Sequence, residues 1–138
     1  MIRKATLQDV SAISVGDSEF VSASREEFVR RAIPREGVYL LEQGGKIIGI
    51  GVLEYTFFEH GFISLLYVNP SARRTGAGES LLRYFVSVSQ TPKLFSSTNQ
   101  SNKPMQALFS KLGFEPSGII HNLDSDDPEL VYYKRVRE

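Results

Sequence analysis

Arginine and glycine residues are concentrated in one short segment, at Arg73, Arg74, Gly76 and Gly78. The segment follows the apolar run 62–68 and precedes a helical pattern, so its backbone would open a helix. The first N–H groups of a helix have no partner within the helix, and they attract anions. Glycines let this backbone approach phosphate oxygens, and arginines add charge-assisted hydrogen bonds. The spacing therefore predicts a diphosphate site, with a flexible, solvated turn as the alternative.

Two familiar nucleotide-binding loops are excluded by the neighbouring residues. A P-loop ends in Gly-Lys followed by Ser or Thr, whereas Gly78 is followed by Glu79. A dinucleotide-binding fingerprint needs glycine or alanine where this chain has Leu81. A different kind of fold must therefore hold the predicted diphosphate.

The elements around this segment alternate between strands and helices. Apolar runs are separated by turn residues, of which Gly44-Gly45 is the clearest hairpin signal. Pro34 is expected to end one helix, and Gly113 is expected to follow the end of another. The predicted strands span residues 2–6, 38–42, 46–53, 62–68, 94–97, 118–123 and 130–136, and helical patterns span residues 10–13, 24–33, 81–88 and 105–112. This order predicts a mixed α+β sheet with helices on both faces.

The composition is that of an ordinary globular protein. The 138 residues suit a single domain over residues 1–138, and 16 basic residues balance 16 acidic ones. Such a balance gives no long-range field that would attract nucleic acid or an anionic membrane surface. Because the chain has no cysteine and no apolar stretch long enough to span a membrane, we expect a soluble, cytoplasmic protein without a thiolate metal site.

The sequence resembles the GNAT superfamily of acetyl-CoA-dependent N-acetyltransferases over nearly its whole length. Val68-Asn69-Pro70 followed by Arg73-x-x-Gly76-x-Gly78 looks like the pyrophosphate motif of that family, and Asn102 with residues 107–114 is similar to its second motif. The resemblance implies a central, mostly antiparallel twisted sheet of about six or seven strands. Helices would cover both faces, and strands four and five would splay apart to hold acetyl-CoA.

The resemblance also implies where acetyl-CoA would bind. The backbone at the end of the fourth strand would contact the pantetheine arm, and the amides of the following loop would bind the pyrophosphate. Asn102 would lie beside the arm, and it could also cap a helix that starts near Pro104. The implied acetyl-CoA-binding residues are Leu66, Tyr67, Val68, Arg73, Arg74, Thr75, Gly76, Ala77, Gly78, Asn102 and Phe109.

The implied reaction is direct transfer of an acetyl group to a primary amine, on a small molecule or on a lysine or N-terminus of a protein. A backbone N–H near Val68 would stabilise the developing oxyanion. Many family members have a tyrosine acid where this chain has Phe109, and a glutamate or histidine base at positions that match Phe62 and Ser64. The resemblance therefore assigns neither the acid nor the base.

Substitute catalytic groups are present elsewhere in the sequence. Glu54 is the preferred candidate for the base, with Glu59 and His60 as further candidates. Tyr133 is the candidate acid, together with its neighbour Tyr132. Each has a structural alternative, because carboxylates near strand ends are usually solvated and strand tyrosines are usually packed.

Two further groups of residues bear on the acceptor. The loop 124–129 contains four carboxylates and would favour a cationic amine near the site, although a charged surface turn is the simpler interpretation. Tyr55, Phe57 and Phe58 could line an apolar pocket, but packing in a core or a dimer contact is expected. Strand pairing or aromatic packing could join two copies as a homodimer. No metal site is expected. The carboxylates lack EF-hand spacing, and two histidines without any cysteine do not make a convincing zinc site.

Two other classes of protein remain open from the sequence. The first is an acyl-CoA sensor without turnover, which Phe109 and the missing base would allow. The second is a structural or interaction domain that keeps the fold without binding CoA, against which the retained arginines and glycines argue. Transfer to amines separates the enzyme from the sensor, and CoA binding separates both from the scaffold.

Overall fold

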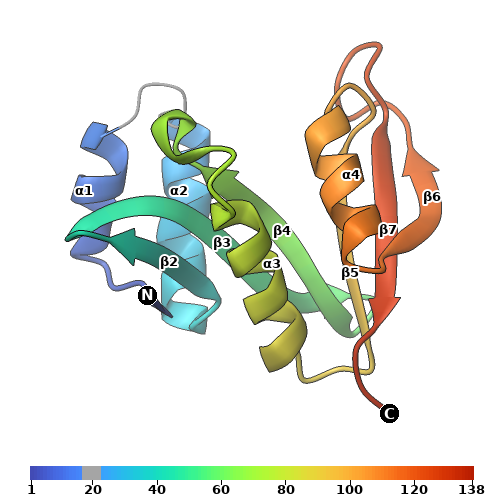
Figure 1. Cartoon of the computed structure of the whole chain (residues 1–138), viewed down its shortest axis with the longest axis horizontal. Coiled ribbons are helices and arrows are strands. Elements are labelled where there is room, and N and C mark those ends of the chain that lie inside the picture. The colour runs from blue at the N-terminus through green and yellow to red at the C-terminus, as the bar shows by residue number, and fades with distance from the viewer. Residues whose placement is uncertain (17–22) are drawn as a thin grey trace. The chain divides into compact units, whose positions relative to one another are not determined.

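The computed structural model of the chain describes residues 1–16 and 23–138 (Figure 1). Its strands are β1 (Ile2–Lys4), β2 (Val38–Gln43), β3 (Lys46–Phe57), β4 (His60–Val68), β5 (Lys93–Asn99), β6 (Glu115–Ile120) and β7 (Glu129–Arg135). Its helices are α1 (Asp9–Gly16), α2 (Ala23–Ala32), α3 (Ala77–Val88) and α4 (Lys103–Lys111), with the short 3-10 helices η1 (Ile33–Arg35) and η2 (Pro70–Ala72). The strands form one sheet in the order β1-β2-β3-β4-β5-β7-β6, in which β4 and β5 run parallel. The predicted mixed, mostly antiparallel sheet is confirmed.

The chain divides into two compact units. The first contains Met1–Leu53 and Leu65–Leu82, and the second contains Glu54–Ser64 and Arg83–Glu138. The divisions fall within β3, β4 and α3 rather than in a linker. The organisation of the chain as a single domain stays a prediction.

The first unit has apolar side chains packed on both faces of its strands. Val10 of α1 and Val29 of α2 pack with Leu40 of β2 in one cluster. Leu41, the next residue of β2, packs with Leu81 of α3 in another. Successive side chains of a strand point to opposite faces, so helices cover both faces of this part of the sheet, as predicted.

Turn residues determine where several of these elements end. Gly44 and Gly45 have φ angles of +59° and +77°, and they form the predicted hairpin between β2 and β3. Helix α2 ends at Ala32, and Pro34 lies in η1, so the proline stops the helix as expected.

One charged cluster joins β1, the start of α1 and β2. The Arg3 guanidinium binds both oxygens of Asp9, at 2.9 and 2.8 Å, and it also donates a hydrogen bond to Glu42. The amide of Thr6 donates to the same Asp9 carboxylate at 2.7 Å. The hydrogen bonds from Arg3 are the largest cause that lowers the pKa of Asp9 from 3.8 to about 2.

We expect Asp9→Asn to lower the free energy of unfolding by about 1 kcal/mol at neutral pH, after allowance for solvent screening of a partly exposed ion pair. The folded-state pKa lies below the ordinary value, so this contribution is present above about pH 4 and is lost as the pH falls toward 2. Urea denaturation of both proteins across this pH range measures the difference. Asp126→Asn, at an exposed loop carboxylate, is the control, and an equal loss there would contradict the assignment.

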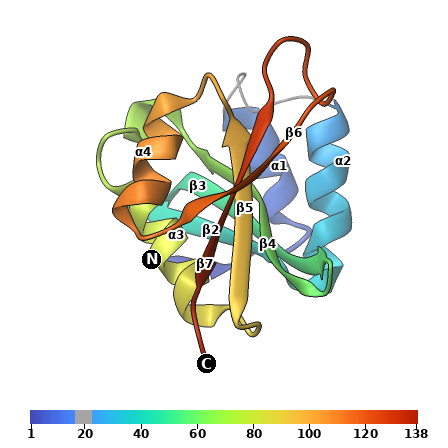
Figure 2. The ribbon, with the colours of Figure 1, turned by 90° about the vertical axis from the view of Figure 1, so that its right-hand side faces the viewer.

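In the second unit, α4 lies against one face of β5 and β7 (Figures 1 and 2). Phe109 of α4 is 1% exposed, and its ring stacks on Tyr132 of β7 with 4.7 Å between the ring centroids. The ring centroid of Phe114 lies 5.4 Å from that of Phe109. Ser96 of β5 pairs with Tyr132 and is buried on this face. This face is therefore the core side of the second unit.

The hairpin of β3 and β4 extends further than predicted. Strand β3 continues to Phe57, so Tyr55 and Phe57 lie within the strand, and Phe58 and Glu59 form the turn. Both turn residues have positive φ angles, +52° and +68°, in a position where glycine or asparagine is usual. Phe57 stacks on Phe62 at 4.6 Å, as the packing prediction expects. Phe58 is 81% exposed, so it does not close a core, and the expected alternative of a dimer contact stays a prediction.

Candidate functional site

The end of β4 continues beyond its ladder with β5. The parallel ladder covers Gly61–Ile63, whereas β4 itself continues to Val68. In the first unit, Leu66 and Val68 pack with Ala77 of α3, and Tyr67 packs with the cluster on the opposite face. The side chains of this segment take part in packing, so its backbone is what the segment can offer to a ligand.

Arg73 fastens the following loop to the end of β4. Its Nε donates to the carbonyl oxygen of Val68 at 3.0 Å, and its guanidinium carbon lies 5.5 Å from the centre of the Tyr67 ring. The amide of Asn69 also donates to the carbonyl oxygen of Ile48 at 2.8 Å. Arg73 therefore has a structural role at this loop, which the sequence motif alone did not reveal.

Gly76 is the residue at which the loop becomes a helix. Its φ angle is +89°, and a Cβ added there would meet no atom within 4 Å. The amide of Ser80 donates to the carbonyl oxygen of Gly76 at 2.9 Å, which is the first turn of α3. The N–H groups of Ala77 and Gly78 come before this bond, where an α-helix offers no acceptor of its own. The geometry presents a positively polarised backbone to an anion.

Arg74 and Thr75 differ in what they can offer to a ligand. Arg74 is exposed and has a φ angle of +66°, which is uncommon for a residue other than glycine. The hydroxyl of Thr75 donates to the carbonyl oxygen of Ala72. Because that proton is used within the loop, the backbone amide of Thr75 is its more suitable donor to a phosphate.

The family model for the Acetyltransferase (GNAT) family matches residues 7–114 of this chain. This range includes β4, the following loop and α3. The chain belongs to this family. It is therefore an acetyltransferase. The match confirms the resemblance drawn from the two motifs.

Relatives with this fold cover almost the whole chain. A crystal structure of a GNAT-family acetyltransferase from Bacillus cereus ATCC 10987 is 36% identical, with a TM-score of 0.89 over 98% of this chain and 96% of that one. A protein of Bacillus subtilis (strain 168) named "Putative ribosomal protein bS18-alanine N-acetyltransferase" is 24% identical, over 99% of this chain and 96% of the relative. The structure of the ribosomal-protein-S18-alanine N-acetyltransferase from Escherichia coli shares the fold, with a TM-score of 0.82 at 20% identity over 100% of this chain and 94% of that one.

Two residues that the GNAT resemblance assigns to acetyl-CoA lie in the second unit. Asn102 caps α4, since its Oδ1 accepts a hydrogen bond from the amide of Met105 at 3.2 Å. The structural alternative for Asn102 is thus confirmed. Phe109 lies in the core of its unit, where its 1% exposure leaves little ring surface for a ligand. Contacts of both residues with acetyl-CoA stay predictions.

The candidate acid and base also lie in the second unit. Glu54 is half-buried in β3, and Tyr133 is half-buried in β7, 5.7 Å from the ring of Phe95. Tyr132 is 6% exposed and stacks on Phe109, so Tyr133 is better suited to meet a ligand. The catalytic roles of Glu54 and Tyr133 stay predictions.

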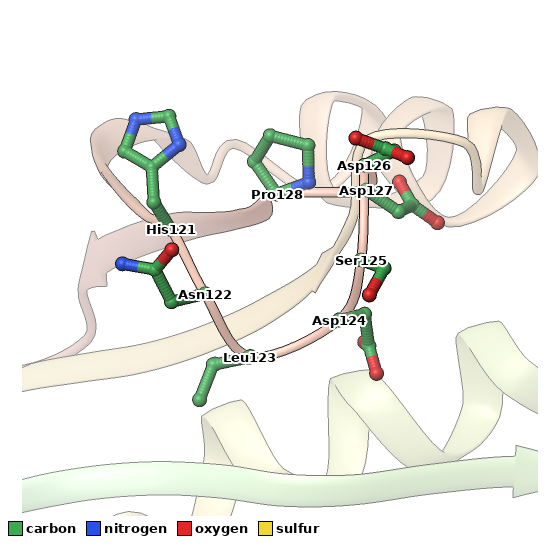
Figure 3. A pocket seen from close by; sticks show the side chains of 8 residues that line it. All are labelled: His121, Asn122, Leu123, Asp124, Ser125, Asp126, Asp127 and Pro128. Carbon is green, nitrogen blue, oxygen red and sulfur yellow. The ribbon is translucent and has the colours of Figure 1, made fainter.

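The acidic loop between β6 and β7 lines a hollow of about 540 Å³ (Figure 3). Asp124 accepts a hydrogen bond from Asn99 at 2.8 Å, and Asp127 accepts one from the amide of Ser101 at 3.0 Å. Two of the carboxylates therefore hold the loop itself, which favours the interpretation as a charged surface turn.

Within residues 1–16 and 23–138, no cluster of acidic, histidine or cysteine side chains could hold a metal ion. In the same residues, no helix is long and apolar enough to cross a membrane.

Phe95, which the sequence places only in a strand, is a further residue of interest. It lies in β5 opposite Phe62 of β4 and opposite Tyr133 of β7. Its ring is half-exposed between buried Leu94 and buried Ser96, an alternation that the residue types do not show, because Phe95 is apolar and Ser96 is polar. The register that brings the three rings into one row requires the structure.

Proposed function

We propose that this GNAT acetyltransferase uses acetyl-CoA to acetylate a primary amine. The observation that carries the proposal is the loop between β4 and α3, where two arginines and a left-handed glycine precede the N–H groups of the helix. A diphosphate suits this backbone, because it can accept hydrogen bonds from successive amides and from a guanidinium at once. The space in front of Gly76 is open, so the residues present fit that group.

Each part of acetyl-CoA has its own candidate contacts in this proposal. The amides of residues 75–78 and the side chain of Arg74 would hold the pyrophosphate. The backbone of residues 66–68, where the ladder with β5 has already ended, would bind the pantetheine arm. Asn102 and Phe109 are further candidates for the arm on the basis of the family resemblance.

The reaction requires a neutral amine and a stabilised oxyanion. The amine nitrogen forms a bond to the thioester carbonyl carbon, the carbon–sulfur bond breaks, and the sulfur leaves with the electron pair as a thiolate. One amine proton goes to a base and the thiolate takes up a proton, so the products are an amide and free CoA. A backbone N–H near Val68 would stabilise the oxyanion, a contact whose loss typically costs about 3 kcal/mol.

Proton transfer would be the task of residues outside the loop. An alkylammonium has a reference pKa of about 10.4, so it must lose a proton before it attacks. Glu54 is the candidate base and Tyr133 the candidate acid. The names of the bacterial relatives favour the N-terminal amine of a protein as one acceptor class, and a small-molecule amine is the other.

Calorimetry of acetyl-CoA binding tests the donor site, with Arg74→Gly as the variant. Glycine adopts a φ angle of +66° without strain, so this change removes a charge and leaves the loop backbone intact. We expect the native chain to bind in the micromolar range and Arg74→Gly to bind about tenfold more weakly, a difference of about 1.4 kcal/mol.

Arg74→Lys is the matched control, because it keeps the positive charge and should keep most of the affinity. Failure of the native chain to bind millimolar acetyl-CoA would refute the proposal. If the chain binds acetyl-CoA but transfers acetyl groups to no amine, it acts as a sensor instead of an enzyme.

A further inference from the structure

A row of aromatic rings crosses one face of the second unit. Phe62 of β4 pairs with Phe95 of β5, and Phe95 pairs with Tyr133 of β7. The Phe95 and Tyr133 ring centroids are 5.7 Å apart. Phe57 extends the row, because its ring stacks on Phe62 at 4.6 Å and lies 5.2 Å from Phe95. Directly opposite residues in a sheet share a face, so these rings form one surface.

This surface lies on the side of the sheet opposite the core of the unit. Ile63, Ser96 and Tyr132 follow or precede the three paired rings by one residue, and all three are buried. Tyr132 is the residue that stacks on α4. The rings of Phe62, Phe95 and Tyr133 are only half-buried. Such a contiguous aromatic face is a feature of binding surfaces rather than of an ordinary strand exterior.

Charges on the same face differ on the two sides of the row. Toward the C-terminal end of β5, the Ser97 hydroxyl donates to the Glu129 carboxylate at 2.7 Å. Toward the N-terminal end of β5, Lys93 lies opposite Arg135 in the ladder. Residues two apart in a strand share a face, so the aromatic row has the Glu129 carboxylate on one side and two cations on the other. The exposed Glu115, opposite Tyr133, adds a carboxylate beside the last ring.

Two buried polar atoms of the described residues have no hydrogen-bond partner, the Nδ1 of His60 and the Oγ of Ser64. Ser64 lies on the Glu129 side of the row and follows directly after Ile63, where the ladder of β4 with β5 ends. Leaving a buried hydroxyl unpaired is costly, and such groups are often found where a ligand or water binds. Strand β4 then continues from Ser64 to the segment 66–68 proposed to hold the acetyl donor.

We infer that the acceptor is a primary amine on an aromatic or apolar body, whose ring stacks on the row formed by Phe62, Phe95 and Tyr133 and whose ammonium group is bound by Glu129. Rings attract both an aromatic body and an ammonium cation, and the Glu129 carboxylate complements the positive charge. The cations on the other side of the row repel an ammonium group, so the charges set the direction of the bound amine. This inference rests on the proposed acetyl transfer, and it extends that function to the class of acceptor.

Steady-state transfer to paired acceptors tests the inference. We expect kcat/KM for 2-phenylethylamine to exceed that for 1,4-diaminobutane by about tenfold or more. Two peptides, with phenylalanine or glycine at the free N-terminus, distinguish a protein source of the same chemistry from a small molecule. A preference for the aromatic member in either pair supports the inference, and equal or reversed preference in both pairs overturns it.

Two variants assign the effect to the row. Phe95→Leu keeps an apolar side chain but removes the ring, and it should lower kcat/KM for 2-phenylethylamine about tenfold while little changing that for 1,4-diaminobutane. Glu129→Gln keeps an acceptor for Ser97, and it should raise KM for both amines about tenfold. Phe28→Leu, at an exposed ring of α2 in the first unit, is the matched control and should change neither.

Acetyl-CoA calorimetry on the same variants separates this inference from the proposed function. Unchanged donor affinity in Phe95→Leu and Glu129→Gln, together with the kinetic changes, supports acceptor binding at the row. Equal kinetic losses for both amines in Phe95→Leu overturn the inference while leaving acetyl transfer intact. Absence of donor binding in the native chain removes both.

Discussion

Gly76→Val is expected to weaken acetyl-CoA binding by about a hundredfold, or about 2.7 kcal/mol. Gly76 has a φ angle of +89°, which a β-branched residue adopts only with strain, so the loop would rearrange in front of α3. Any valine side chain that kept the native backbone would project into the open space that the proposal gives to the pyrophosphate. Both effects move the amides of the helix away from the phosphate oxygens. Calorimetry with acetyl-CoA measures the loss.

The chain offers a matched control for this variant at Gly45. Gly45 also has a positive φ angle, +77°, and a Cβ added there would also meet no atom within 4 Å. The two valine variants should therefore lose similar stability, about 1–3 kcal/mol each, as measured by urea denaturation. Only Gly76→Val should lose affinity for acetyl-CoA.

Two results would count against the loop as the donor site. Equal losses of affinity in Gly76→Val and Gly45→Val would trace the effect to general stability. Native affinity in a folded Gly76→Val protein would show that the diphosphate, if it binds, does so elsewhere.

The parts of the fold that the sequence predicts are those governed by local chemistry. The Gly44-Gly45 hairpin follows from backbone freedom, and the end of α2 before Pro34 follows from a missing amide. The loop from Arg73 to Gly78 is contiguous, so its position between a strand and a helix could be read from the order of residues alone. The cap of α4 by Asn102 is equally local, because its partner is the amide three residues further on.

The features that the sequence does not predict depend on register and packing between distant segments. Phe62, Phe95 and Tyr133 form one row because three strands pair at particular residues, and nothing in each strand alone specifies that alignment. Phe58 and Glu59 form a turn with positive φ angles although neither is a usual turn residue, so local propensity favoured a shorter strand. The pairing of β3 with β4 in the sheet overrides that propensity.

The candidate site shows the same division. The predicted donor residues from Leu66 to Gly78 lie together in the first unit, because they are close in sequence. The acid and base had to be chosen among residues scattered over several strands, and residue type alone could not rank them. Burial now separates Tyr132 from Tyr133, a distinction that adjacent identical residues cannot reveal in sequence.

We expect Phe109→Ala to lower the free energy of unfolding by about 3–5 kcal/mol, the largest stability effect among the variants considered. The ring is 1% exposed and lies between Tyr132 and Phe114, so its removal leaves a cavity in the core of the second unit. Urea denaturation at neutral pH measures the change. Phe58→Ala is the control, because its ring is 81% exposed and its loss should change stability by less than about 0.5 kcal/mol.

Phe109→Leu then distinguishes a ring that serves the core from one that also serves the ligand. Leucine keeps most of the apolar volume, so the loss of stability should stay below about 1.5 kcal/mol. If the ring acts through packing alone, the folded leucine variant binds acetyl-CoA as the native chain does. A loss of affinity in that variant, with stability nearly preserved, would support the contact between Phe109 and the pantetheine arm that the family resemblance implies. A stable Phe109→Ala protein would contradict the core position itself, because a cavity of that size cannot form without cost.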